Sequence, residues 1–260
     1  MELYKDEKKI MPRFSFITAL LFLSSACFAD DPEKNDCSSG AKKTLSLNDG
    51  FYLGIGGGYS WCSVQRNVHA TILGDSLFRE TTFVNPDGFM GTLFVGYGHF
   101  IKERGYLGAE LFSNLTGIDK KISTTIFQSL GEFTYKTKTS TNFSYGVSLL
   151  PGYKVNDCSL IYLRLGFVRA RFKEKEKESL LNAPNGAPFL QTTLDRYTNG
   201  CSYGFGFEEA VYWRLSLRAE FSRTSYWSFG NTYTSFVSST TAKLQPSTNQ
   251  FTLSLIWKIW

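Results

Sequence analysis

The connections between the strand-like segments of this chain alternate strictly between long and short. Eight segments alternate apolar and polar residues with a period of two, which is the pattern of a β-strand with one apolar face. Four of the seven connections are polar and roughly 20 residues long, and the other three are short turns. A long connection comes first and last. The segments are 51–64, 88–102, 105–116, 141–155, 160–172, 201–212, 215–227 and 250–260.

This order of connections favours a transmembrane barrel over a soluble sandwich. Each segment has about the length that a tilted strand needs to cross a bilayer, roughly 9–11 residues plus its ends. Membrane barrels place short turns on the periplasmic side and long loops outside, whereas a soluble sandwich has no reason to sort its loops. We therefore predict an all-β fold over residues 51–260. It is an eight-stranded antiparallel up-and-down transmembrane β-barrel with four long outward loops, short periplasmic turns and periplasmic termini.

Charged residues define the two faces of the predicted strands. In "LSLRAEFS", Leu215 and Leu217 alternate with Ser216 and Arg218. An Arg that faced lipid at mid-bilayer would cost about 2–4 kcal/mol, so we expect the charged face to point inward. Eight strands leave an interior just wide enough for side chains to fill, which predicts an ion-paired plug. The predicted interior cluster consists of Glu110, Arg164, Glu208, Arg218 and Glu220.

Aromatic residues make up 16% of the chain and gather at the ends of these segments. Two aromatic girdles that flank an apolar band are typical of transmembrane barrels. A soluble all-β protein with an aromatic core is the alternative. It does not account for the alternation of long and short loops in a chain whose N-terminal segment has the order of a secretory signal. The predicted girdles are Tyr59, Trp61, Tyr203, Tyr226 and Trp227 beside the long loops, and Tyr106, Tyr153, Tyr162, Trp213 and Trp257 at the other end.

The N-terminal segment has the order of a secretory signal. "MPRFSFITALLFLSSACFADD" offers Arg13, a short apolar run and small residues, and we expect cleavage between Ala29 and Asp30. Residues 1–29 are thus predicted to be a signal peptide and 30–50 a polar periplasmic leader. Translation starts at Met1 or Met11. Lipidation at Cys27 and a buried helix are the alternative interpretations of this segment.

The last segment, "NQFTLSLIWKIW", is predicted to be the closing strand, which pairs with the first strand and removes the sheet edge. Its lipid-facing set is Phe251, Leu253, Leu255, Trp257 and Ile259, which leaves Trp260 one residue out of phase. Either Ile259 takes the terminal role with Trp260 appended, or the strand changes phase at Ile256.

As an ordered set, several of these motifs resemble a known family. "GFYLGIGGGYSW", "GFMGTLFVGYGHF", "GYLGAELFSN", "IYLRLGFVRARF" and "GFGFEEAVYWRLSLRAEFS" are similar to the small outer-membrane barrels of the opacity/OmpA-like type. The resemblance covers 51–260 except the long loops. It implies a Gram-negative outer-membrane barrel, and a final aromatic in such barrels acts as an assembly signal for the outer-membrane assembly machinery. Some relatives bind host cells or serum factors, and others tie the envelope together or form weak pores.

The sequence predicts no catalytic, cofactor or metal site. His69 falls in the first long loop and His99 near the inner end of the second segment, which places them on opposite sides of the membrane. A lipid-modifying enzyme at the outer rim would need His69 beside a loop serine, and this is a minor alternative. The chain has no G-x-S-x-G elbow. The net charge of +5 is small, without the lysine-rich stripe of a nucleic-acid binder.

After cleavage four cysteines remain, an even number that permits two disulfides in an oxidising compartment. Cys37 and Cys158 fall at the periplasmic end, and Cys62 and Cys201 near the outer rim. Because a disulfide joins Cα atoms less than about 7 Å apart, bonds across the membrane are excluded. We therefore predict Cys37–Cys158 and Cys62–Cys201, although the first and sixth strands are not neighbours. A zinc site is the weaker interpretation.

A run of alternating charge, "KEKEKES", leaves the fifth segment at 173–179. It is interpreted first as a solvated strand extension with cross-paired charges, and alternatively as a contact surface for lipopolysaccharide phosphates or a host polyanion.

Together these features predict a non-enzymatic outer-membrane surface protein whose loops serve interaction or adhesion, with an envelope-structural role. A narrow porin is the alternative. The expected partners are outer-membrane lipid, lipopolysaccharide, the assembly machinery, and host cell-surface or matrix molecules.

Overall fold

The computed structural model describes residues 46–259, except 73–74, 103, 129–130, 181–189 and 235–237. The predicted signal peptide with its Ala29–Asp30 cleavage site, Cys37 and Trp260 lie outside the described residues. Within them, no helix is long and apolar enough to cross a membrane. The strands are β1 (Gly50–Ile72), β2 (Asp75–Val84), β3 (Asp87–Ile101), β4 (Gly105–Gln128), β5 (Gly131–Lys154), β6 (Ser159–Leu180), β7 (Leu190–Tyr212), β8 (Leu215–Tyr226), β9 (Phe229–Thr234) and β10 (Ser238–Lys258).

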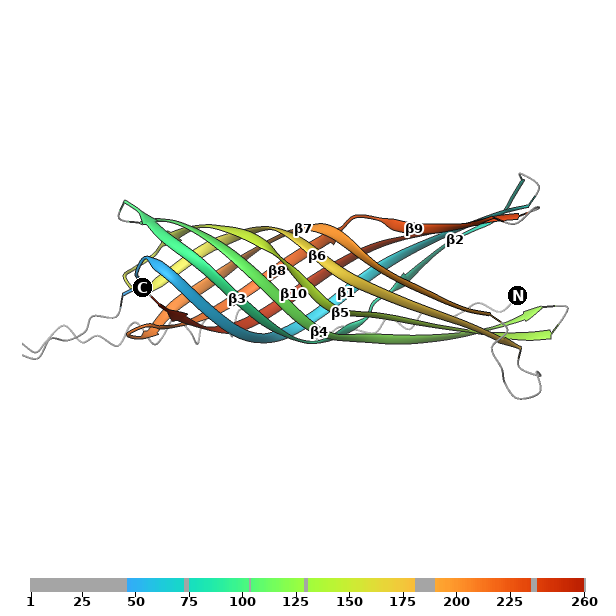
Figure 1. Ribbon diagram of the computed structural model, residues 1–260, viewed down its shortest axis with the longest axis horizontal. Coiled ribbons are helices and arrows are strands. Elements are labelled where there is room, and N and C mark those ends of the chain that lie inside the picture. Colours follow the sequence, from blue (N-terminus) through green and yellow to red (C-terminus); the bar gives the residue numbers. More distant parts are fainter. Residues whose placement is uncertain are drawn as a thin grey trace, which may run out of the picture. The chain divides into compact units, whose positions relative to one another are not determined.

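These strands form one antiparallel sheet that closes into a barrel (Figure 1). Closure is made by β1 and β10, which pair from Tyr52↔Lys258 to Ile72↔Ser238. β2 continues β3 along one side of β1, and β9 continues β8 along one side of β10. Each of these two pairs therefore takes the place of one continuous strand in the barrel wall, interrupted at 85–86 in the first pair and at 227–228 in the second. We call the eight strand positions of the wall staves. The predicted eight-stranded antiparallel barrel is confirmed.

Side chains alternate between the lumen and the outside along every stave. On β3, Phe94 is 8% exposed, while its neighbours Leu93 and Val95 are 56% and 47% exposed. This alternation follows from the pleat of the strand, in which successive side chains point to opposite faces of the sheet. Along the closed barrel the outward face of all eight staves is predominantly apolar, as a wall that contacts lipid must be.

The three short turns lie at one end of the barrel, at 102–104, 155–158 and 213–214. The start of β1 and the end of β10 lie at the same end (Figure 1). The residues just before β1 also contact this end. Leu47 is buried and donates its backbone N–H to the carbonyl of Asp157 at 2.9 Å, and Asp49 accepts from the N–H of Phe100 at 2.7 Å.

The four long connections, predicted as loops, are mostly β-structure. The first strand was expected to end at residue 64 but continues to Ile72, and β4 continues from the expected residue 116 to Gln128. The predicted boundaries were therefore too short at the outer end. Polar residues such as Thr, Ser and Lys extend the strands as two-stranded hairpins beyond the apolar band.

Beyond that band the barrel divides into two four-stranded sheets, which extend apart from each other in Figure 1. The first arm has the strand order β2–β1–β10–β9, and the second arm has the order β4–β5–β6–β7. They separate because β4 pairs with β3 only up to Met90↔Thr116, and β7 pairs with β8 only from Gly200↔Tyr226. In the described part of the chain, the outer portions of β2, β9, β4 and β7 therefore pair on one side only.

Candidate functional site

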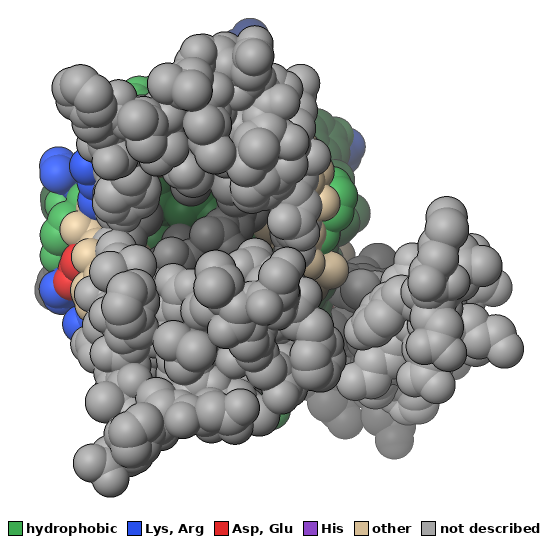
Figure 2. Space-filling model, turned by 90° about the vertical axis from the view of Figure 1, so that its right-hand side faces the viewer, with side chains coloured by type: hydrophobic (Ala, Val, Ile, Leu, Met, Phe, Trp, Pro, Cys, Tyr) green, Lys and Arg blue, Asp and Glu red, His purple; other side chains and the backbone are tan. Residues whose placement is uncertain are grey.

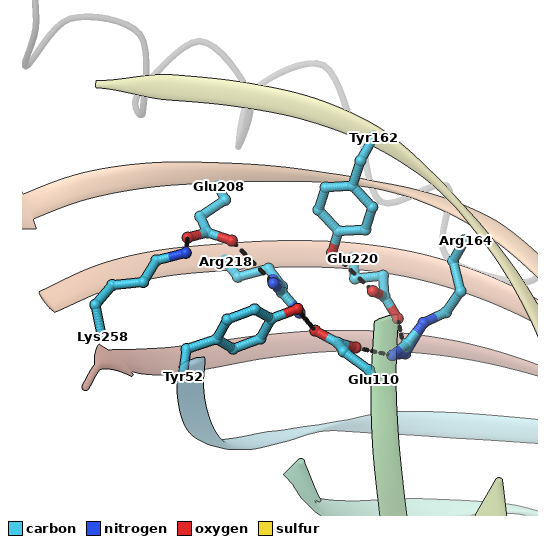
Figure 3. Close-up of polar contacts among 8 residues, drawn as sticks. All are labelled: Tyr52, Glu110, Tyr162, Arg164, Glu208, Arg218, Glu220 and Lys258. Atoms are coloured by element: carbon cyan, nitrogen blue, oxygen red, sulfur yellow. Dashed lines mark hydrogen bonds and ion pairs between the residues drawn. The ribbon is translucent and has the colours of Figure 1, made fainter. Parts of the chain in front are cut away.

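The lumen contains a network of ion pairs at its centre (Figure 3). Arg164 pairs with Glu110 and, at 2.9 Å, with Glu220. Arg218 pairs with the same Glu110 and, at 2.9 Å, with Glu208, whose second oxygen lies 3.2 Å from the Nζ of Lys258. These residues come from β4, β6, β7, β8 and β10, so the network crosses the lumen rather than following one wall.

All five residues of the predicted interior cluster lie in this network and are buried. Three further members were not predicted as part of it. Tyr52 donates its hydroxyl to Glu110 at 2.9 Å, Tyr162 donates to Glu220 at 2.7 Å, and Lys258 supplies the third cation. We call these eight residues the lumen network. Its three carboxylates and three cations balance, as buried charges require.

Aromatic rings enclose the two arginines of the lumen network. The guanidinium carbon of Arg218 lies 4.9 Å from the ring centre of Phe94 and 5.1 Å from that of Tyr162, and Arg164 lies 5.0 Å from Phe112. Such cation–π contacts strengthen when water is excluded. They fix each planar guanidinium so that it can reach two carboxylates at once.

Glycines make room for these rings. A Cβ on Gly54 would lie 2.2 Å from Phe94, and a Cβ on Gly206 would lie 2.2 Å from the hydroxyl of Tyr162. Gly54 of "GIGGG" and Gly206 of "GFGF" therefore allow close packing, because a ring from a neighbouring strand fills the place of the missing side chain.

Buried apolar side chains lie in the lumen on both sides of the network. The layer at the turn end consists of Leu47, Tyr106, Leu150, Leu160 and Ala210, and the layer toward the arms includes Cys62, Val64, Val84, Ile118, Phe172, Tyr226 and Leu244. Between the network and the outer layer lies a cavity of about 20 Å³, lined mostly by hydroxyl and amide side chains. It has room for one or two water molecules.

Three predicted girdle residues lie inside the barrel instead. Tyr106 is 4% exposed, Tyr162 is 3% exposed and Tyr226 is 6% exposed. The girdle prediction rested on their position near segment ends and ignored the phase of the alternation. Tyr162 alternates with Ile161 and Leu163, so the same period that places Arg164 in the lumen also places Tyr162 there. The same argument would have found Tyr52 and Lys258.

The predicted Cys62–Cys201 disulfide is wrong. Cys62 points into the lumen on β1 and is 2% exposed, whereas Cys201 is exposed on the outer face of β7. β8 and β10 lie between these two strands. Because the two thiols lie on opposite faces of the sheet and their strands are not neighbours, they cannot form a disulfide of normal geometry. Cys158 is half-buried near the β5–β6 turn, and its predicted pairing with Cys37 stays a prediction because Cys37 lies outside the described residues.

The two histidines lie at opposite ends of the barrel, as expected. His69 is exposed on the outer part of β1. His99 lies near the end of β3, where its Nδ1 is 2.8 Å from a carboxylate oxygen of Asp49. Among the residues that the structure describes, no group of three His, Cys, Asp or Glu side chains is placed to hold a metal ion.

The closing strand keeps one phase through its length. Leu253, Leu255 and Trp257 are 46–54% exposed on the outer face, and Ile256 is fully buried in the lumen. The alternation continues to Lys258, so the proposed change of phase at Ile256 is wrong.

Comparison with known proteins places this barrel among outer-membrane proteins. A family model described as an outer membrane protein beta-barrel domain matches residues 19–258. Among curated protein sequences, none matches the chain significantly. Similar solved structures include OprG from Pseudomonas aeruginosa, with 12% identity, a TM-score of 0.49, and coverage of 82% of this chain and 99% of that one. Ail of Yersinia pestis, in complex with the heparin analogue sucrose octasulfate, has 13% identity, a TM-score of 0.30 and coverage of 75% and 99%. The protease OmpT from Escherichia coli has 8% identity, a TM-score of 0.43 and coverage of 85% and 100%.

The family match extends over most of the sequence and includes all eight staves of the closed barrel. The chain therefore belongs to the outer membrane protein beta-barrel domain family and lies in the outer membrane.

Proposed function

We propose that this outer-membrane barrel is a closed, non-enzymatic anchor that presents two β-sheet arms for interaction or adhesion at the cell surface. The observation that carries the proposal is the combination of an ion-paired lumen with strands that continue well beyond the lipid-facing band. An ion network that crosses the lumen between two sets of buried apolar side chains supports a closed barrel. The two arms are then the part of the molecule that is available for interaction outside the membrane. We propose an envelope-structural role for the barrel in addition.

The arms offer a specific mode of recognition for a protein partner. The outer portions of β2 and β9 border the first arm, and those of β4 and β7 border the second. A strand that pairs on one side only presents backbone N–H and C=O groups to which an extended segment of another protein can add. Host cell-surface or matrix proteins are the partners that we propose. The aromatic closing strand is our proposed signal for the assembly machinery.

Conductance distinguishes this proposal from the narrow-porin alternative. We expect the refolded protein in planar bilayers to show no stable channels at modest voltage, because Arg164 and Arg218 hold carboxylates from three strands across the lumen. A positive control is a variant in which six residues of the lumen network, Glu110, Arg164, Glu208, Arg218, Glu220 and Lys258, are all replaced by Ser. Stable openings of the wild-type protein would favour the porin.

Shortening the hairpins tests the surface role directly. The β4–β5 hairpin can be cut at the register pair Ile118↔Thr141 and rejoined with an Asn-Gly turn, and the β6–β7 hairpin at Phe172↔Arg196. In the first arm the corresponding pairs are Val64↔Val84 and Leu244↔Phe229. We expect binding of host cells by surface-expressed protein to fall at least tenfold when the arm that carries the contact is shortened.

The barrel itself is the internal control for these variants. Each cut leaves the lumen network and the lipid-facing band intact, so heat-dependent migration on gels should match that of the wild type. Equal host-cell binding by the wild type and by a variant with all four hairpins shortened would contradict the proposal.

A further inference from the structure

The outward face of β6 carries a column of positive charges. Beyond the apolar residues of this face, every second residue is a cation, namely Arg169, Arg171, Lys173 and Lys175, and we call these four the basic column. Arg169, Arg171 and Lys175 are exposed and Lys173 is half-buried. Residues two apart on a strand are about 7 Å apart, so the column runs roughly 20 Å along the arm.

In the register of the second arm, one lysine of the basic column lies opposite a carboxylate and the other does not. Lys173 lies opposite Asp195 on β7 and Ser140 on β5. Lys175 lies directly opposite Lys138 on β5 and Thr193 on β7. The next pair outward is Lys136↔Lys177, again two lysines. Like charges directly opposite each other destabilise a sheet. The interpretation of "KEKEKES" as a strand extension is confirmed, since β6 continues to Leu180, and cross-pairing with a carboxylate holds for Lys173 but not for Lys175.

The inner end of the basic column is ordered by its neighbours on β7. Tyr197 lies beside both arginines, with its ring centre 5.4 Å from the guanidinium carbon of Arg169 and 5.9 Å from that of Arg171. Asp195 accepts two hydrogen bonds from Arg171, at 2.8 and 2.6 Å, and these bonds lower the pKa of its carboxyl group. Asp195 is thus ionised at neutral pH, and it is one carboxylate beside four cations.

The position of the column relative to the bilayer indicates its partner. Ile161, Leu163, Leu165 and Phe167 form the lipid-facing run of β6, and Arg169 is the next outward-facing residue. The column therefore begins where the hydrocarbon ends and continues away from the membrane. The end-on view in Figure 2 shows Lys and Arg side chains on one flank of the outer end, beside an acidic side chain and hydrophobic ones.

We propose that the basic column binds the phosphate groups of lipopolysaccharide in the surrounding outer leaflet. The phosphates of lipid A lie at the level of Arg169 and Arg171, and those of the inner core lie farther out, beside Lys173 and Lys175. Arginine suits the inner positions because its planar fork binds phosphate through two hydrogen bonds. A soluble polyanion is disfavoured, because the column faces sideways from the barrel wall, where neighbouring lipid molecules already stand. This inference is independent of the proposed surface interaction.

The test compares binding of purified bisphosphorylated lipopolysaccharide by the full chain, reconstituted in phosphatidylcholine vesicles, with binding by charge-neutralised variants. Each cation near an anionic membrane surface contributes about a fivefold gain in affinity. We expect the quadruple variant R169Q/R171Q/K173Q/K175Q to bind at least tenfold more weakly and to lose most of its salt dependence. Wild-type protein should bind monophosphorylated lipid A more weakly than the bisphosphorylated form.

The matched control neutralises two exposed cations outside the column, Arg223 on β8 and Lys243 on β10. R223Q/K243Q should weaken binding less than R169Q/R171Q does, because its two cations lie on different strands rather than in one column. The charge-conserving variant R169K/R171K should recover most of the binding that R169Q/R171Q loses. An unchanged affinity in the quadruple variant would overturn the proposal. So would a variant that loses heparin binding but keeps its affinity for lipopolysaccharide, since the column would then serve a soluble polyanion.

Discussion

Replacement of Arg218 by Met is expected to lower the free energy of unfolding by about 3–5 kcal/mol. Arg218 contacts both Glu110 and Glu208, and the variant leaves three carboxylates with two cations in a closed lumen. Removal of one member of a buried ion pair is costly because the remaining charge has lost its partner away from water. Urea unfolding of the protein in lipid vesicles measures the loss.

A second substitution separates charge imbalance from lost packing. In the double variant Arg218→Met with Glu110→Gln, the pairs Glu208–Lys258 and Arg164–Glu220 remain and the charges balance again. We expect the double variant to recover at least half of the lost stability. If it is no more stable than Arg218→Met alone, the cost lies in packing against Phe94 and Tyr162 rather than in the unpaired carboxylate.

The faces of the barrel could be predicted from the sequence because one physical rule decides them. A charge is costly in lipid, so Arg164 and Arg218 each fix the phase of a whole strand, and the period of two then places every neighbour. The same rule places Tyr52, Tyr162 and Lys258 in the lumen. The girdle prediction failed for Tyr162 because proximity to a turn was given more weight than phase.

The arms could not be predicted in the same way. Outside the bilayer both faces of a strand meet water, so residues such as Thr137, Thr139 and Ser140 carry no contrast that marks where a strand ends. The partners of "KEKEKES" depend on register, which is set by pairing with β5 and β7 and shifted by the irregularity between Thr141 and Phe143. The prediction of a Cys62–Cys201 disulfide failed for a related reason. It considered at which end of the barrel each cysteine lies, but not whether its side chain points into the lumen or outward.

Replacement of Leu163 by Arg is expected to destabilise the barrel in a bilayer by about 2–4 kcal/mol, the cost of an Arg at the midplane on the lipid-facing side. Leu163 is 56% exposed in the apolar run of β6, and its neighbour Arg164 is buried in the lumen network. The same side chain is therefore tolerated at one position and costly at the next, because successive residues face different media.

The control for this substitution is an Arg placed on the outer face nearer to the membrane surface. Ser225 is exposed on the outer face of β8, one outward position beyond the native Arg223. An Arg at such an interfacial position costs only about 0–1 kcal/mol, because its head reaches the polar region, so Ser225→Arg should unfold nearly as the wild type does. If Leu163→Arg and Ser225→Arg were equally stable in vesicles, the apolar run of β6 would not lie in hydrocarbon. The level assigned to the basic column directly above that run would then be wrong as well.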